Sequence, residues 1–252
     1  MMDATRQMNH GFEDGALRFD GDLVVVTGGS RGIGAAIADL FVSLGARVVS
    51  VARTSPEAPR AGIFELVADL TDDRAPDTIG ARVQQEWGIP TVLVNNAGIN
   101  LRTSLTEFAT QAIQQEFMVN AVAAARLISV IGGLMRTAGR GSIVNVGSVK
   151  ATLPGRSLGY GMSKAALENL TRSAAASLGP QGIRVNAVAP GDVLTDIATH
   201  DQGRAYRNPL HRAVTTTDVA WAVAFLSSVQ AGSITGVILR VDAGFGIGFS
   251  PP

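Results

Sequence analysis

Hydrophobic and polar positions follow two alternating patterns along this chain. Short runs of consecutive apolar residues, such as Leu23-Val-Val-Val26, predict buried strands, and longer stretches with apolar residues at helical spacing predict amphipathic helices. We expect strands at 23–26, 47–52, 63–68, 91–94, 142–146, 184–189 and 237–241. We expect helices at about 35–44, 79–87, 105–136, 158–178 and 219–226, the last of them capped near Thr217-Asp218.

The regular alternation of these elements predicts an α/β fold. Strand, helix and strand in this rhythm favour right-handed crossovers and a parallel sheet. Seven strands then form one doubly wound sheet with helices on both faces. Since no repeat or low-complexity linker interrupts the pattern, we expect a single domain over residues 21–252. Residues 1–20 show no periodicity, and we expect them to form a flexible extension.

Composition and charge narrow the class of function. The formal net charge of +0 gives no global field to attract nucleic acid or an anionic membrane, so we expect neither partner. The chain has no cysteine, which excludes disulfides and thiol nucleophiles, and His10, His200 and His211 lack metal-ligand spacing. We therefore expect no metal site. No signal-peptide pattern and no membrane-spanning apolar run are present, so we expect a soluble, cytoplasmic protein.

A glycine-rich loop joins the first predicted strand to the first predicted helix, with the sequence Thr27-Gly-Gly-Ser-Arg-Gly-Ile-Gly34. Glycine permits a tight turn and a close approach of the backbone to a pyrophosphate, and the helix N-terminus offers free amide N–H groups. The same glycines also suit a tight strand-to-helix turn that binds nothing. In this context the loop predicts a dinucleotide site.

Two arginines near this loop bear on the choice of cofactor. Arg53 stands at the end of the second predicted strand, where an NAD site often places an acidic residue and an NADP site places an arginine. Arg31, within the glycine loop, offers a second positive charge. Both arginines also suit a solvated surface. Together they favour NADP(H) over NAD(H).

Tyr160 and Lys164 lie four residues apart in a predicted helix, on the same face. A nearby positive charge favours phenolate and lowers the pKa of a tyrosine toward working pH. Such a tyrosine can give or take a proton from a substrate oxygen. An exposed Tyr/Lys pair without chemistry has the same spacing.

Taken together, these motifs resemble those of the short-chain dehydrogenase/reductase family over roughly residues 21–244. The matching motifs are Thr27 to Gly34, Asp69-Leu70, Asn95-Asn-Ala-Gly98, Asn120, Ser148, Tyr160 with Lys164, and Pro190-Gly191 followed by Thr195. The resemblance implies a single Rossmann-type domain and an NAD(P)-dependent oxidoreductase.

The resemblance also implies roles in binding the cofactor. Asp69 would bond the adenine amino group, Asn95 to Gly98 would form the wall beside the adenosine ribose, and Thr195 would touch the nicotinamide carboxamide. The full expected set is Gly28, Ser30, Arg31, Gly32, Ile33, Gly34, Arg53, Asp69, Leu70, Asn96, Ala97, Gly98, Tyr160, Lys164, Pro190, Gly191, Val193 and Thr195.

Four residues would carry catalysis by the same resemblance. Tyr160 would be the general acid in reduction, and Ser148 would hydrogen-bond the substrate oxygen. Lys164 would bind the nicotinamide ribose and lower the pKa of Tyr160. Asn120 would hold a water that links Lys164 to solvent. A serine that ends a strand also often only caps the following turn.

The substrate is less defined by sequence. Its determinants should lie in segment 149–158, with Lys150, Leu153 and Arg156, and in a lid over residues 192–210. The motif style resembles 3-oxoacyl-carrier-protein reductases as well as sugar and secondary-alcohol dehydrogenases. Gln181 and Gly139 stand where carrier-protein reductases usually present basic residues. We therefore expect an NADPH-dependent ketone reductase, with 3-oxoacyl thioesters among the candidate substrates.

Two alternatives remain open from the sequence. One is an NAD-dependent dehydrogenase of sugars or secondary alcohols, and the other is a dinucleotide-binding regulator without turnover. Family members commonly form tetramers, so we expect a homotetramer or homodimer. Its interfaces would pair helices 105–136 and 158–178, and the last helix and strand.

Overall fold

A computed structural model describes residues 17–56, 58–155, 157–194 and 208–248. Seven strands form one parallel sheet in the order β3-β2-β1-β4-β5-β6-β9, which confirms the predicted fold class. These strands are β1 (Leu23–Thr27), β2 (Arg47–Ala52), β3 (Ile63–Val67), β4 (Val92–Asn95), β5 (Gly141–Val146), β6 (Ile183–Pro190) and β9 (Ile238–Val241). The strand order reverses direction between β1 and β4. At such a point the crevice beyond the carboxyl ends of the strands is where doubly wound sheets bind ligands.

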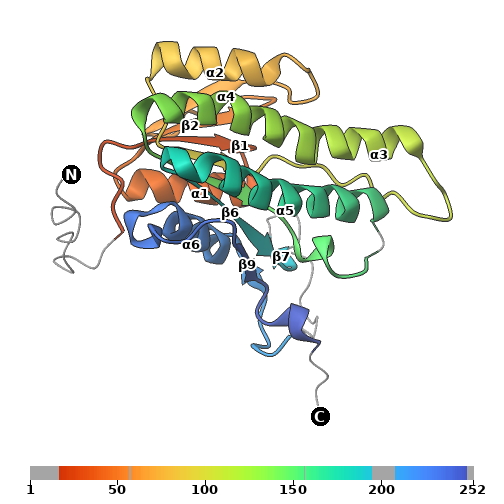
Figure 1. Cartoon of the computed structure of the whole chain (residues 1–252). Helices are drawn as coiled ribbons and strands as arrows, with labels where there is room; N and C mark the ends of the chain where they lie inside the picture. The colour runs from red at the N-terminus through yellow and green to blue at the C-terminus, as the bar shows by residue number, and fades with distance from the viewer. Residues whose placement is uncertain (1–16, 57, 156, 195–207, 249–252) are drawn as a thin grey trace.

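Helices cover both faces of the sheet (Figure 1). On one face lie α2 (Ala75–Glu86), α4 (Ala123–Ala138) and α5 (Leu158–Leu178), and on the other lie α1 (Gly32–Ser43) and α6 (Thr216–Ser227). Each face has its own hydrophobic core, because strands buried on both sides carry apolar residues at consecutive positions. Leu127 and Ile131 on α4 are fully buried in one core, and Ile37 and Phe41 on α1 in the other.

The helix predicted over 105–136 differs from the observed one. Residues 105–109 are not helical; α3 (Thr110–Phe117) begins later, and a π-helical turn, η2 (Met118–Val122), joins it to α4. The apolar periodicity carries no signal for the extra residue of a π turn. By length and composition the whole stretch Thr110–Ala138 could cross a membrane, but half of its most apolar window is buried inside this domain, as a core helix is.

The start of the packed chain also differs from the prediction. Phe19 is only 3% exposed, and its ring meets Phe41 of α1 edge-on with ring centres 4.7 Å apart. The Phe19 amide donates a hydrogen bond to the Leu44 carbonyl at 2.8 Å. The extension predicted for residues 1–20 is therefore wrong at its end, because residues 17–20 belong to the packed domain. Residues 1–16 lie outside the described part.

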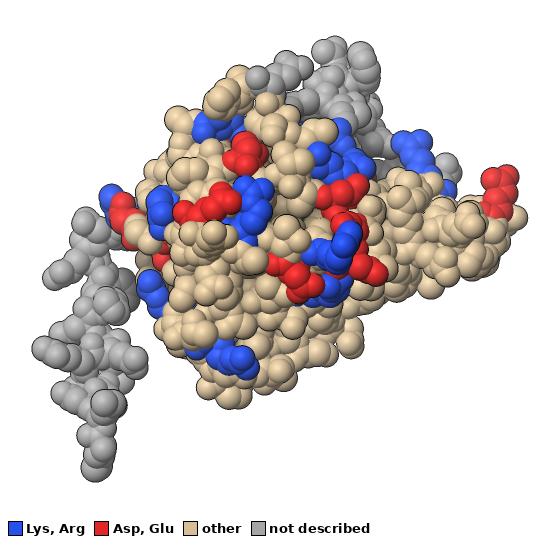
Figure 2. Space-filling model, turned by 90° about the horizontal axis from the view of Figure 1, so that it is seen from above, with Lys and Arg blue, Asp and Glu red and all other residues tan. Residues whose placement is uncertain are grey.

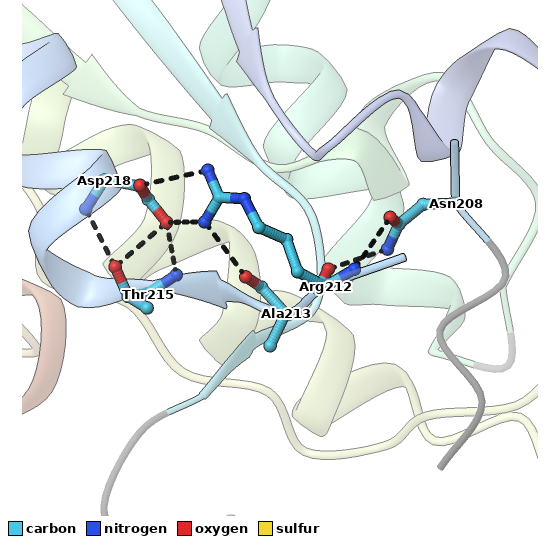
Figure 3. A network of polar contacts seen from close by, with 5 residues as sticks. All are labelled: Asn208, Arg212, Ala213, Thr215 and Asp218. Carbon is cyan, nitrogen blue, oxygen red and sulfur yellow. Dashed lines mark hydrogen bonds and ion pairs between the residues drawn. The ribbon is translucent and has the colours of Figure 1, made fainter. Parts of the chain in front are cut away.

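The N-terminus of α6 is held by a polar network (Figure 3). Thr215 is the N-cap, and a capping box joins its hydroxyl and amide to the amide and carboxylate of Asp218. Arg212 donates to the same carboxylate at 2.9 Å, while the Asn208 side chain binds the Arg212 backbone. The cap predicted near Thr217-Asp218 is thus placed two residues too late, since Asp218 is the third helical residue. Thr215 also belongs to a small parallel pair, β7 (Val193–Leu194) with β8 (Val214–Thr215).

Charged side chains are mixed on the face of the molecule in Figure 2. Lys and Arg side chains lie beside Asp and Glu side chains there, and no single-sign area covers this face. Ion pairs between exposed or partly exposed side chains include Arg126 with Asp77 at 2.7 Å and Arg82 with Glu86 at 2.8 Å.

Candidate active site

The glycine loop has the geometry of a ligand cradle. Gly28 and Gly32 have φ angles of +65° and +56°, a left-handed conformation that glycine adopts without strain. A Cβ at Gly34 would overlap the Gly28 carbonyl, so the helix start and the strand end approach as closely as two backbones can. This close approach places the α1 N-terminus at the carboxyl end of β1, and α1 begins without a side-chain cap. Its first amides are thus available to an anion.

A cleft of about 670 Å³ opens over this loop, beyond the ends of β1, β2 and β4. Its volume suits a cofactor-sized ligand. Twelve of the predicted cofactor residues line it: Gly28, Ser30, Arg31, Gly32, Ile33, Gly34, Arg53, Asp69, Leu70, Asn96, Ala97 and Gly98. The structure therefore brings together residues that are spread over 71 positions of the sequence.

Charge at the cleft rim is carried by Arg31, Arg53 and Asp69, all of them exposed. The backbone N–H of Thr71 donates to the Asp69 carboxylate at 2.9 Å, and this hydrogen bond, with a smaller contribution from Arg53, lowers the pKa of Asp69. Asp69 is therefore an anion fixed in direction at the rim, and the two arginines supply cations able to meet a phosphate.

Two residues that hold the cleft walls were missed by the sequence reasoning. The Thr27 hydroxyl accepts the amides of Asn96 and Ala97, each at 3.1 Å, and so fixes the wall made by β4 to the glycine loop. Arg60 donates to the Gly29 carbonyl at 2.9 Å and to the Glu65 carboxylate at 2.9 Å, behind the loop. No local pattern marks either role, because their partners lie far along the chain.

Asn95 was expected in the cleft wall, but the structure places it outside that wall. It is 4% exposed, and its side chain points into the sheet, where it donates to the Asn145 side chain at 2.9 Å. Asn145 in turn donates to the Thr171 hydroxyl of α5 at 2.9 Å. This buried polar row ties β4, β5 and α5 together, and the cleft wall begins at Asn96.

Ser148 and Tyr160 meet beyond the end of β5. Ser148 is buried and accepts the Lys150 amide at 3.2 Å, and its hydroxyl lies near enough to the Tyr160 hydroxyl to favour the phenolate. It therefore caps the turn η3 (Val149–Ala151) and lies beside the candidate acid. Burial raises the pKa of Tyr160, the Ser148 hydroxyl opposes this, and the negative charge of Glu116 adds to the rise.

Lys164 is almost fully buried beside this pair. Its ammonium donates to the Val146 carbonyl at 2.7 Å and stands 5.7 Å from the centre of the Tyr160 ring. Burial lowers the pKa of Lys164 to about 8. The expected lowering of the Tyr160 pKa is not found in the protein by itself, because desolvation of the phenol outweighs the favourable contacts.

Asn120 lies in the π turn, and its side chain is fully engaged by the protein. Its Oδ1 accepts the Ile99 amide at 2.8 Å, and its Nδ2 donates to the Ile99 carbonyl and the Ser163 hydroxyl, both at 2.9 Å. Both amide hydrogens are therefore taken, so a side-chain N–H does not hold the expected water. A Cβ at Gly98 would stand 3.2 Å from Asn120 Oδ1 and 3.4 Å from Lys164 Nζ, which places Asn120 and Lys164 directly behind the cleft wall.

Those of the remaining predicted cofactor residues that the structure describes do not line the cleft. Pro190 ends β6 and is buried, Gly191 packs against Asp242, and Val193 pairs with Val214 in the small sheet. Thr195 lies outside the described residues, as does most of the predicted lid. Among the described residues no group of three His, Asp or Glu side chains is arranged to hold a metal ion.

A second cavity, of about 470 Å³, adjoins Tyr160. It is formed by the segment after Ser148 and the first turns of α5, where substrate determinants were expected. Of the described residues that line it, only Lys150 carries a charge. The Lys150 ammonium stands 5.5 Å from the centre of the Phe245 ring, and Arg240 donates to Thr152 at 3.1 Å, so the C-terminal segment braces this wall.

Comparison with known proteins places this geometry in a family. A family model described as enoyl-(acyl carrier protein) reductase matches residues 28–246. Galactitol 2-dehydrogenase of Rhizobium johnstonii is 36% identical over 247 residues, covering 90% of this chain and 96% of the relative. The 3-oxoacyl-(acyl-carrier-protein) reductase FabG of Escherichia coli is 32% identical over 240 residues, covering 90% and 98%.

Solved structures agree with the sequence relatives. A putative NAD(P)-dependent gluconate 5-dehydrogenase from Beutenbergia cavernae, solved with bound NADP at low occupancy, is 31% identical with a TM-score of 0.82. The match covers 91% of this chain and 98% of that one. The chain belongs to the short-chain dehydrogenase/reductase family of NAD(P)-dependent oxidoreductases that act on CH–OH groups.

Proposed function

We propose that this enzyme interconverts a ketone and a secondary alcohol with NADP(H), and that Tyr160 is its general acid and base. The observation that carries this proposal is the neighbouring pair of Ser148 and Tyr160, with Lys164 buried beside it and Gly98 of the cofactor cleft lying against the Lys164 ammonium. The pair thus adjoins a cradle for a dinucleotide on one side and a cavity for a small molecule on the other.

The residues of the cleft fit a dinucleotide. The bare backbone at Gly28 and Gly34 and the uncapped start of α1 suit a pyrophosphate, and Asp69 is an acceptor for an adenine amino group. Arg31 and Arg53 suit the 2′-phosphate of NADP(H). When bound, the nicotinamide supplies or accepts the hydride. The cleft residues bind and orient it.

In the direction of reduction, Tyr160 donates its phenolic proton to the carbonyl oxygen as the carbonyl carbon gains the hydride and the oxygen becomes a hydroxyl. Ser148 donates a hydrogen bond to the same oxygen and shares its developing negative charge. Burial keeps Tyr160 protonated at neutral pH, which suits an acid. Lys164, whose pKa of about 8 lies near working pH, can exchange protons beside the tyrosine.

Two alternatives stand beside this proposal. One is an NAD-dependent dehydrogenase of sugars or secondary alcohols, and the resemblance to galactitol 2-dehydrogenase supports its substrate class. The resemblance to FabG keeps 3-oxoacyl thioesters among the candidate substrates. The other alternative is a dinucleotide-binding regulator without turnover. We further propose one catalytic domain from Leu17 onward, working in the cytoplasm as a homotetramer or homodimer.

The test begins with NADPH and NADH titrations followed by nicotinamide fluorescence, and continues with a panel of ketones, sugars and 3-oxoacyl thioesters. Tighter NADPH binding with turnover of a ketone is the expected result. Tyr160→Phe should then lose turnover by about 10²- to 10⁴-fold with cofactor affinity unchanged. Ser173→Ala, an exposed change on the same helix, is the matched control. Normal turnover by Tyr160→Phe would remove the proposed acid.

A further inference from the structure

Glu116, in the last turn of α3, is a buried carboxylate that the mechanism above does not use. It is 0% exposed, and its oxygens accept the Leu101 amide at 2.8 Å and the Thr103 hydroxyl at 3.0 Å. Within the described part of the chain it has no ion pair with Lys or Arg. A buried charge without a counterion is costly, so its surroundings must compensate it.

That compensation comes from the start of α5. The Gly159 amide donates to the Thr103 hydroxyl at 2.8 Å, and the Leu158 amide donates to the Thr103 carbonyl at 2.8 Å. Ser157, the N-cap of α5, makes no side-chain capping bond of its own. Thr103 therefore caps the helix from a distant loop, and Glu116 anchors Thr103. The partial positive charge of a helix N-terminus stabilises the carboxylate in return.

The carboxylate also lies directly against the residue that precedes Tyr160. A Cβ at Gly159 would overlap Glu116 Oε2 and stand 3.0 Å from the Thr103 hydroxyl. Only glycine at position 159 leaves room for this contact. In Figure 1, α3 and α5 run side by side, so the first turn of α5 packs against the end of α3.

We propose that Glu116 is a positioning residue for Tyr160. Its carboxylate, acting through Thr103, fixes the first turn of α5 and so the direction in which the Tyr160 side chain leaves the helix. The negative charge of Glu116 also opposes ionisation of Tyr160. The inference rests on the proposed role of Tyr160 as the acid. It adds a residue that contacts neither cofactor nor substrate.

The charges around Tyr160 support the second part of this role. The other titratable groups placed near Tyr160 are Lys164, on the same helix, and Lys150, which lines the cavity beside Tyr160 from η3. Glu116, from α3, is a negative charge that adds to the rise in the pKa of Tyr160 caused by burial. Ser148 carries no charge. Removal of the Glu116 charge should therefore shift the balance toward phenolate.

Direct titration of the phenol tests the inference without a substrate. The chain has two tyrosines, so in a Tyr206→Phe background the ultraviolet absorbance of phenolate reports Tyr160 alone. Glu116→Gln should move the Tyr160 titration to lower pH. Glu116→Leu, which replaces the charge by an apolar side chain of similar size, should do the same and serves if the first variant fails to fold. An unmoved titration in a folded variant would overturn the charge role.

Kinetics then separate charge from position. In ketone reduction kcat/KM should fall at alkaline pH as Tyr160 loses its proton. In Glu116→Gln this alkaline limb of the pH profile should move to lower pH. Thr103→Val keeps the charge but breaks the hydrogen-bond chain, so it should lower kcat about tenfold or more without moving that limb. Unchanged kcat in Thr103→Val would overturn the positioning role. Failure of Tyr160 as the acid would appear separately, as normal turnover in Tyr160→Phe.

Discussion

Lys164 donates its ammonium hydrogen bond to the backbone carbonyl of Val146, the last residue of β5, at 2.7 Å. The candidate catalytic lysine is thus held by the strand that leads to Ser148. A single carbonyl does not replace the hydration of an ammonium ion, and burial therefore lowers the pKa of Lys164 from 10.5 to about 8.

This shift predicts how stability depends on pH. Between about pH 8 and pH 10.5 the unfolded chain holds a proton on Lys164 that the folded chain has released, so unfolding takes up a proton and stability rises with pH. Lys164→Met should abolish this rise and should not lower the melting temperature at neutral pH, because it removes a buried charge. Calorimetry from neutral to alkaline pH measures both. Lys150→Met, at a partly exposed position, should keep the rise. A lysine variant that melts lower and retains the slope would contradict this account.

Arg53 predicts the cofactor preference. Arg53→Ala should weaken NADPH binding by about ten- to a hundredfold, the worth of a charge-assisted phosphate contact, and leave NADH binding nearly unchanged. Fluorescence titration with both cofactors measures the ratio. Arg47→Ala is the control, because Arg47 is exposed at the opposite end of β2 and contacts the Trp87 carbonyl. Equal weakening of both cofactors would place the 2′-phosphate elsewhere.

The α6 cap predicts a loss of stability in acid. The pKa of Asp218 is lowered from its ordinary 3.8 to about 2, and the hydrogen bond from Arg212 is the largest cause. The contribution of ionised Asp218 to the free energy of unfolding is therefore complete above pH 3.8 and is lost as the pH falls through about 2. Asp218→Asn should cost about 1 kcal/mol at pH 7, a value reduced for the partial exposure of the pair. Urea unfolding at neutral and acidic pH measures the difference, with exposed Thr217→Ala as the control. A cost that persists at pH 2 would contradict the assignment.

Lys150 predicts a substrate preference. It is the one charge among the described residues that line the cavity beside Tyr160, so ketones with a carboxylate or phosphate group should be preferred over neutral analogues. Lys150→Met should lower the ratio of kcat/KM for acidic over neutral ketones about tenfold, and Lys150→Arg should retain most of that ratio. Matched pairs of acidic ketones and their esters measure it. Equal losses for both members of each pair would assign Lys150 to packing against Phe245 alone.

Sequence reasoning predicted those features whose cause is local. The glycine loop, the seven strands and α5 carry their signals within a few residues, and the sheet then brings Gly28 and Asn96 together at the switch point. What it missed depends on distant partners. Arg60 finds Gly29 across 31 positions, and Phe19 is buried because Phe41 lies beside it. The direction of the Tyr160 pKa shift could not be predicted from the sequence, because burial raises this pKa more than the nearby Ser148 hydroxyl lowers it.

The π turn at Met118–Val122 separates the rotational phases of the two helices it joins. Each residue turns an α-helix by about 100°, so deletion of one residue there would rotate everything beyond it by more than a quarter turn. Either Glu116 would lose its contact with the start of α5, or Ile131 would lose its packing against the sheet. The continuous helical stretch of 29 residues thus packs against α5 near its start and against the sheet farther along. A natural variant shortened by one residue at the π turn would keep the helix and lose one of these two packing contacts.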